Sequence, residues 1–281
     1  ILRNRKPVLP PIRVGNNSFL LDSEKANAFA DSLRNQCTPN PSSSELAELH
    51  RKISSDVRNF VIPESVIVPC SPNEINCLIR RLKNRKAPGE DGVSNKVLKL
   101  LPRRYLVVIC NIINACMRLS YFPDVWKEAI AIFIPKKGKA LNTPDGFRPI
   151  SLLSSLGKLA ESVLLTRVNS HLEANNIIPD SQFGFRQGHG TGHQLLRVTE
   201  HIADSLNKRH HTAMVLLDIR QAFDRVWHDG LVHKLIQLNF PPYIIGTIRS
   251  YLTNRKFKAK IGEALSDSRP ISAGVTQGGK L

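Results

Sequence analysis

Cysteine is scarce in this sequence and shows no pairing pattern. There are five cysteines in 281 residues, and no two of them form a CxxC pair. Structural zinc sites are built from closely spaced Cys and His ligands, so a zinc site is not expected. The odd number of thiols, without a secretory leader, leads us to expect reduced, intracellular cysteines.

Long apolar runs and several well-known catalytic loops are also missing. No apolar run approaches the ~20 residues that a membrane-spanning helix needs, so we expect no membrane span. The sequence contains no Walker-type phosphate loop, no GxSxG turn and no GxGxxG fingerprint. His189 and His193 are four residues apart, but no Glu or third ligand accompanies them, which excludes the metalloprotease pattern.

Acidic residues are too few to balance the basic ones. Lys and Arg total 40 against 23 Asp and Glu, which gives a net charge of +17 and an isoelectric point of about 10.0. Such an excess is typical of proteins that bind a polyanion, because basic side chains release the counterions of phosphates. With 41% hydrophobic residues the chain can still form a core, so we expect a folded protein that binds nucleic acid.

Apolar periodicity predicts a helix-rich chain. Residues 1–14 are basic and interrupted by proline, which indicates an extended arm, and 37–44 (CTPNPSSS) indicates a linker. Ser71 to Glu74 form a capping box with Pro72 at the first helical position. Helices are predicted at 22–33, 46–57, 71–82, 102–119, 152–168, 195–206, 231–238 and 242–252.

Short β-rich runs lie between these helices. Residues 129–134 and 147–150 predict a hairpin, and its loop carries the basic run 136–139. Residues 213–217 predict a fully apolar strand, and 257–261 and 268–275 predict two more strands. The fold class is therefore α+β.

Asp218 follows directly on the apolar run 213–217. A carboxylate at the end of a buried strand can hold Mg²⁺, a hard ion that prefers rigid oxygen ligands. Two such ions can stabilise both the attacking and the leaving oxygen of a phosphoryl transfer. Asp218 is equally suited to be the N-cap of a helix that begins near Gln221. The motif alone leaves both roles open.

Other candidates flank this position. Phe223 could lie under the sugar of a nucleotide, although local periodicity favours core packing against Val226 and Trp227, and we interpret Asp224 as structural. Lys136 and Arg148 on the predicted hairpin suit a triphosphate, since Arg binds phosphate with two donors and Lys adds a compact charge. A solvated basic loop is the alternative for these two residues.

Three further segments favour nucleic-acid binding. The basic runs 83–86 and 255–260 could follow a phosphate backbone. The loop 182–191 mixes glycines, aromatics and Arg186, so its backbone can approach phosphates and its rings can stack on bases. Lys86, Gly89, Arg186, Lys256 and Lys258 are the residues that we select as candidate contacts.

Taken in order, six stretches resemble the reverse transcriptases of LINE-type, non-LTR retrotransposons. They cover roughly residue 71 to the end of the chain. The segment at 25–40 (KANAFADSLRNQCTPN) looks like the arthropod jockey-type elements in particular. The stretches are KAPGEDGV (86–93), IPKKGK (134–139), FRPISLLSSLGKLAE (147–161), QFGFRQGHGT (182–191), VLLDIRQAFDRVWH (215–228) and AGVTQG (273–278).

The resemblance implies a right-handed polymerase that synthesises DNA on an RNA template from a DNA primer and dNTPs. It implies fingers at 71–165 and an incomplete palm at 166–281 with an interleaved fingers segment, after an N-terminal helical extension and linker at 1–70. A thumb is not expected within the chain. The protein would be intracellular, in the nucleus and in cytoplasmic ribonucleoprotein.

The same resemblance implies roles for individual residues. Asp218 would be the catalytic ligand of Mg²⁺, with two ions in the complete enzyme, and the carbonyl of Ile219 would lie beside it. Phe223 would select the sugar. Lys136 and Arg148 would hold the triphosphate. Gln277 would lie along the nascent base pair, and Gly278 would allow close backbone approach.

Three departures from the family pattern bear on activity. Thr276 stands where Pro is usual, and Gly279-Lys280-Leu281 stands where the family continues Gly-Ser-Val-Leu. The paired aspartates of the family lie outside the sequence, so we expect residues 1–281 alone not to polymerise. The residues also leave open a non-catalytic RNA-binding module, or another right-handed polymerase such as an intron maturase.

Overall fold

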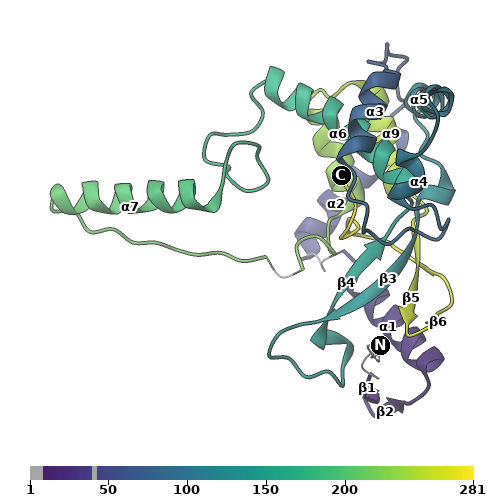
Figure 1. Ribbon diagram of the computed structural model, residues 1–281. Coiled ribbons are helices and arrows are strands. Elements are labelled where there is room, and N and C mark those ends of the chain that lie inside the picture. The colour runs from purple at the N-terminus through teal and green to yellow at the C-terminus, as the bar shows by residue number, and fades with distance from the viewer. Residues whose placement is uncertain (1–8, 40–42, 220) are drawn as a thin grey trace. The chain divides into compact units, whose positions relative to one another are not determined.

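The computed structural model describes residues 9–39, 43–219 and 221–281, and Figure 1 traces its elements. The helices are α1 (Asp22–Gln36), α2 (Ser44–Asn59), α3 (Pro72–Arg81), α4 (Asn95–Lys99), α5 (Arg103–Arg118), α6 (Ser155–Ala174), α7 (Thr191–Asn207), α8 (His228–Gln237) and α9 (Pro242–Leu252), with 3₁₀ turns η1 (Asp124–Trp126) and η2 (Pro144–Gly146). The strands are β1 (Ile12–Val14), β2 (Asn17–Phe19), β3 (Glu128–Pro135), β4 (Phe147–Leu152), β5 (Lys256–Ile261), β6 (Ala264–Leu265) and β7 (Arg269–Pro270). The architecture is α+β, as predicted.

The chain divides into two compact units. The first comprises residues up to 168 together with 221–281, and the second comprises 169–220. The second unit holds the end of α6, the glycine-rich loop, α7 and the extended residues that follow it.

The main sheet of the first unit joins segments that are far apart in the sequence. β3 and β4 form the predicted antiparallel hairpin, with Ile132 opposite Ile150. On its other side β3 pairs in parallel with β5, so that Ala131 lies opposite Ala259. β6 and β7 both pair with β5 in antiparallel orientation. β1 and β2 form a separate two-stranded sheet.

Helix α1 covers one face of this sheet. Its predicted apolar face is buried, with Phe29 fully buried and its ring centroid 4.5 Å from that of Phe133. The strands oppose it with small residues, Ala131 and Ala259, which are fully buried and let the helix approach closely. Because helix and sheet bury each other's apolar side chains, this contact forms the core that supports β3, β4 and β5.

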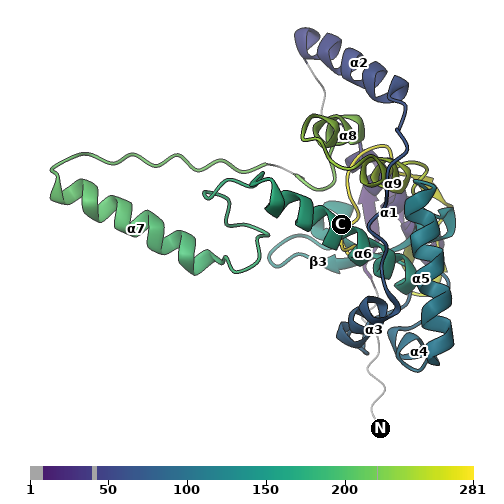
Figure 2. The same ribbon diagram turned by 90° about the horizontal axis from the view of Figure 1, so that it is seen from above.

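Helix α2 packs against α8, although the two are far apart in sequence (Figure 2). The ring of His50 lies 4.2 Å from that of Trp227, and the hydroxyl of Ser54 donates to a carboxylate oxygen of Asp229 at 2.6 Å. The predicted apolar stripe of α2 is only partly buried. Leu46 and Leu49 are about half exposed, so the amphipathic pattern over-predicted burial here.

The prediction of a strand at 213–217 was wrong. These residues are extended but belong to no sheet, and Val215, Leu216 and Leu217 are more than four-fifths exposed. A strand is stabilised by a neighbouring backbone, and no described segment pairs with this one. The predicted strand at 268–275 is reduced to β7, because the following residues bond to loops instead of a strand.

The predicted helices are all present, with ends that differ by a few residues. Over the residues that the structure describes, none of them combines the length and apolarity needed to traverse a bilayer.

Candidate functional site

The hairpin formed by β3 and β4 presents the two basic residues predicted to bind phosphate. Lys136 closes the loop through a bond from its backbone N–H to the carbonyl of Gly146 at 2.7 Å, and its ammonium donates to the carbonyl of Asp145 at 2.9 Å. Arg148 lies opposite Ile134 on β4 and is exposed. No described residue forms an ion pair with Arg148, so its guanidinium is available to a ligand.

The turn at 221–225 carries Phe223 and Asp224. Phe223 is 49% exposed, so it is not a core residue as local periodicity suggested. Asp224 is buried, and its carboxylate accepts a hydrogen bond from the side-chain amide of Gln277 at 2.9 Å. Burial raises the pKa of Asp224, while the Gln277 bond and the charge of Lys136 act in the opposite direction.

The AGVTQG loop at 273–278 packs between that turn and β4. The N–H of Val275 donates to the carbonyl of Phe223 at 2.8 Å, and the carbonyl of Gln277 accepts from the N–H of Ser151 at 2.9 Å. Gly278 has a φ of +131°, and a Cβ at this position would lie 2.5 Å from the carbonyl oxygen of Ser151. The close backbone approach predicted for Gly278 is therefore made with β4.

Thus the hairpin, the 221–225 turn and the 273–278 loop converge in the first unit. They bring Lys136, Phe223 and Gln277 to one region, although these residues are up to 141 positions apart in the sequence. The sequence placed Asp224 beside Phe223 but gave no sign that Asp224 holds Gln277, because the two are 53 residues apart.

A small cavity of about 20 Å³ lies under this loop. Asp224, Gln277 and Cys37 are among the residues that line it. Burial, followed by the negative charge of Asp224, raises the pKa of the Cys37 thiol to about 12. A space of this size holds about one water molecule, so it is no ligand pocket by itself.

Asp218 and Ile219 lie in the second unit, in the extended segment after α7. Both are exposed, and the N-cap alternative for Asp218 was wrong because the described residues 221–225 form turns instead of a helix. Reverse transcriptases generally use divalent metal ions. In the described part of the chain, however, no three His, Cys, Asp or Glu side chains gather as metal ligands.

The candidate nucleic-acid contacts have different surroundings. Lys86 and Lys256 are exposed. Lys258 pairs with Glu90 at 2.5 Å, and Gly89 is buried against the backbone of Ser154, where a Cβ would lie 2.5 Å from the amide nitrogen. The absence of a side chain at Gly89 is therefore needed for packing.

Two other arginines are less available to a phosphate backbone than the sequence suggested. Arg255 is 1% exposed and cannot follow a phosphate backbone, which corrects the prediction for that end of the 255–260 run. Within the second unit, the guanidinium of Arg186 donates to the carbonyl of Pro179 at 3.2 Å and lies 3.6 Å from the carboxylate of Asp180.

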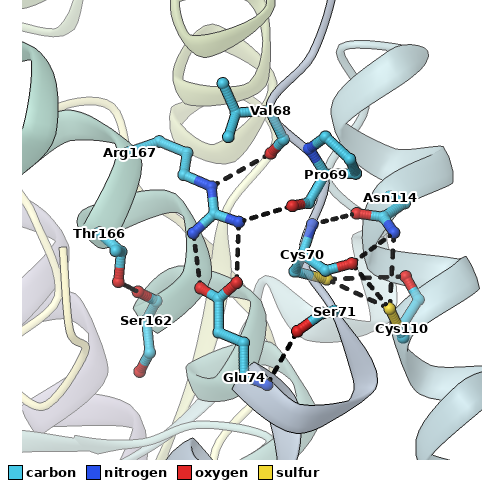
Figure 3. Close-up of polar contacts among 10 residues, drawn as sticks. All are labelled: Val68, Pro69, Cys70, Ser71, Glu74, Cys110, Asn114, Ser162, Thr166 and Arg167. Carbon is cyan, nitrogen blue, oxygen red and sulfur yellow. Dashed lines mark hydrogen bonds and ion pairs between the residues drawn. The ribbon is translucent and has the colours of Figure 1, made fainter.

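An ion pair that sequence reasoning missed joins α6 to the start of α3 (Figure 3). Arg167 donates to both carboxylate oxygens of Glu74, at 2.5 and 2.8 Å, and to the carbonyls of Val68 and Pro69. The hydroxyl of Ser71 caps α3 by accepting from the N–H of Glu74. The capping box is therefore only half formed, because the Glu74 carboxylate is bound to Arg167.

Neighbouring contacts in Figure 3 fix the same segment to α5. Asn114 accepts from the N–H of Cys70 at 2.8 Å and donates to its carbonyl at 3.0 Å. The sulfurs of Cys70 and Cys110 are 3.6 Å apart. Burial, and to a smaller extent the hydrogen bond with Cys110, raises the pKa of the Cys70 thiol to about 12. These buried thiols act as packing groups.

The comparison with protein families identifies the class to which this architecture belongs. The profile of "Reverse transcriptase (RNA-dependent DNA polymerase)" matches residues 134–281, which include the end of β3, the hairpin loop, β4, the 221–225 turn and the 273–278 loop. The chain belongs to the reverse transcriptase family.

Particular relatives are polymerases of non-LTR retrotransposons from Drosophila melanogaster. The chain is 39% identical over 272 residues to the probable RNA-directed DNA polymerase from transposon BS, covering 96% of the chain and 30% of the relative. It is 44% identical over 215 residues to that from transposon X-element, covering 76% and 24%. It is 38% identical over 261 residues to the RNA-directed DNA polymerase from mobile element jockey, covering 92% and 28%. The chain thus spans less than a third of the length of these relatives.

Proposed function

We propose that this chain forms the nucleotide-binding part of an RNA-directed DNA polymerase that copies a retrotransposon RNA into DNA. Residues 71–165 form the fingers, and 166–281 contribute part of the palm with an interleaved fingers segment. Residues 1–70 form an N-terminal extension, and no part of the chain is assigned to a thumb. The partners are an RNA template, a DNA primer and dNTPs.

One observation carries this proposal, namely the convergence of the β3–β4 hairpin, Phe223 and Gln277. A triphosphate is a dense, flexible anion, and Lys136 and Arg148 present two cations from a rigid hairpin. The hydrogen bond that the Gln277 amide donates to the Asp224 carboxylate holds the NH₂ group of Gln277 turned inward. The Gln277 oxygen is then oriented away from Asp224, where it can accept a hydrogen bond from a nucleotide or base pair.

Each residue has a defined task in this proposal. Lys136 and Arg148 bind the phosphates of the incoming dNTP and offset the charge that moves onto pyrophosphate when the primer 3′-hydroxyl attacks. Phe223 lies under the sugar and excludes a 2′-hydroxyl by contact. Gln277 aligns the nascent base pair, so that the reacting groups approach in a fixed geometry.

The metal requirement is assigned to Mg²⁺, with two ions in the complete enzyme. Asp218 and the carbonyl of Ile219 offer two oxygen ligands of the kind that Mg²⁺ prefers. The described residues supply no set that completes the coordination, so no catalytic step is assigned to the ions.

A second candidate function is nucleic-acid binding without synthesis. The net charge of +17 favours it. In either case we propose that the protein acts in the nucleus and in cytoplasmic ribonucleoprotein.

The two candidates differ in nucleotide binding. Residues 1–281 are bound to an oligo(dT) primer on poly(rA), and the dissociation constant of dTTP is measured for wild type and variants. Arg148→Gln and Lys136→Gln should each weaken dTTP binding about tenfold or more, since each removes a charge-assisted contact. Arg80→Gln, an exposed position on α3, is the matched control.

Primer extension on the same template completes the test. Residues 1–281 alone are expected to synthesise no DNA, and synthesis that disappears in Asp218→Asn would contradict that expectation. If Arg148→Gln and Lys136→Gln bind dTTP as the Arg80→Gln control does, the nucleotide-binding assignment is wrong. A steep salt dependence of template binding would then leave the second candidate.

A further inference from the structure

Beneath the 273–279 loop, four side chains of the first unit gather buried polar atoms that lack hydrogen-bond partners. In the described residues six buried side-chain N or O atoms have no partner of standard geometry, and five of them belong to Glu161, Tyr251, Arg255 and Thr276. Glu161 comes from α6, Tyr251 from α9 and Arg255 from the position just before β5, while Thr276 precedes Gln277. Unpartnered buried polar groups are rare in folded proteins, so this concentration calls for a ligand.

The polar atoms converge on the bare α-carbon of Gly279. A Cβ built at Gly279 would lie 2.9 Å from the Glu161 carboxylate, 3.3 Å from the Thr276 hydroxyl and 3.4 Å from the Tyr251 hydroxyl. The Glu161 oxygen that faces Gly279 is Oε2, which accepts from the N–H of Lys280 at 2.5 Å, whereas Oε1 of the same carboxylate has no partner. The Glu161 carboxylate, which can accept hydrogen bonds, and the two hydroxyls, which can both donate and accept, therefore lie around one point, and Thr276 is close enough to Tyr251 to lower its pKa against the effect of burial.

Arg255 adds donors to the cluster. It is 1% exposed, and one of its nitrogens donates to the carbonyl of Tyr251 at 3.1 Å while the guanidinium lies 4.4 Å from the Tyr251 ring. Its remaining two guanidinium nitrogens are unpartnered. Burial raises the pKa of Glu161, although the N–H of Lys280 and the charge of Arg255 lower it.

The charges of the cluster identify the kind of ligand. One carboxylate repels an anion, and one guanidinium repels a cation, so a neutral molecule is favoured. It must both donate to the Glu161 carboxylate and accept from Arg255 or from a hydroxyl. Water meets these requirements, and buried waters typically make about three such bonds.

We propose that Glu161, Tyr251, Arg255 and Thr276 form an internal water-binding site that fixes the Thr276–Gly279 turn to α6 and α9. The water bridges the Glu161 carboxylate to the hydroxyls of Tyr251 and Thr276, and Arg255 donates to the same site. Gln277 is then held on two sides, by Asp224 through its side chain and by this site through its neighbours. Thr276 supplies a hydroxyl that a proline at this position would lack.

The first test is a high-resolution crystal structure of a protein containing the chain. The site should contain ordered water within hydrogen-bonding distance of Glu161 and of the Thr276 or Tyr251 hydroxyl. A direct Glu161–Arg255 ion pair without water, or a side chain from elsewhere in the polypeptide in the site, would overturn the proposal. The unaltered protein is used, so the result does not depend on whether a variant folds.

The second test removes one hydroxyl at a time. Thr276→Val should raise the unfolding equilibrium constant and the hydrogen-exchange rates of the 277–279 amides, each about tenfold or more, and Thr276→Ser should restore both. The double variant Thr276→Val/Tyr251→Phe should lose less stability toward unfolding than the sum of the losses in the two single variants, because the water is already lost with the first hydroxyl. Wild-type exchange rates in Thr276→Val would overturn the proposal. Neither test involves nucleotide binding, so failure here is distinct from failure of the proposed function.

Discussion

Replacing Arg167 by Met should substantially destabilise the first unit. Arg167 is 9% exposed and makes four hydrogen bonds, two to the Glu74 carboxylate and two to the carbonyls of Val68 and Pro69. Met keeps an apolar stem of similar length, so the change removes the guanidinium with little loss of packing volume. The experiment therefore isolates the ion pair and its two carbonyl contacts.

The expected loss follows from what is left behind. Removing one partner of a buried ion pair costs about 3–5 kcal/mol, because the other charge remains uncompensated. The Glu74 side chain is 25% exposed, so water can solvate it in part and the lower end applies. We expect a loss of about 3 kcal/mol in the free energy of unfolding, or about 6–12 °C in Tm for a domain of this size.

Urea unfolding followed by circular dichroism measures this change. Arg80→Met is the control, since Arg80 is exposed on α3 and should lose less than about 0.5 kcal/mol. Glu74→Gln keeps an acceptor for Arg167, and the double variant should show a coupling energy above about 1 kcal/mol. A loss below about 1 kcal/mol for Arg167→Met would refute the reasoning, since the ion pair would then contribute no more than a surface contact.

Two further predictions concern the candidate site. Asp224→Asn should stabilise the chain near pH 7 but not below about pH 4. Burial raises the pKa of Asp224 in the folded state, so the protonated form favours folding at low pH. That stability is lost as the pH rises through the folded-state pKa, and Asn, which carries no charge, avoids the loss. Urea midpoints across that range would test this, and a pH-independent difference would refute it. Gly89→Ala should cost about 1–3 kcal/mol, because its Cβ would lie 2.5 Å from the amide nitrogen of Ser154. Thermal unfolding measures this cost. Gly190→Ala is the control, because a Cβ at Gly190 would have no neighbouring atom within 4 Å. Equal changes in Tm for the two variants would contradict the packing role of Gly89.

Local patterns in the sequence were sufficient for most of the secondary structure. The apolar face of α1, the Ser71 N-cap and the β3–β4 hairpin were predicted because each depends on residues only a few positions apart. The ordered motifs also indicated the reverse transcriptase family, which the family comparison confirmed. The basic excess indicated a polyanion as partner, which stays a prediction.

Contacts between distant residues needed the tertiary structure. The segment at 213–217 has the composition of a buried strand, yet its side chains are exposed, because strand formation depends on a partner that local sequence does not specify. The Gln277–Asp224 bond, the Arg167–Glu74 ion pair and the polar cluster at Glu161 each join residues 50 to 115 positions apart.

The sequence by itself determined the helices and the hairpin, because periodicity and caps act over short distances, and its net charge, summed over the whole chain, predicts a polyanion as partner. Only the tertiary structure decided which charged residues remain available to a ligand. Arg148 and Arg255 are chemically identical, but the side chain of Arg148 is exposed on β4, whereas that of Arg255 is buried against Tyr251. Burial and pairing depend on what the fold places around a side chain, and these neighbours come from distant parts of the sequence.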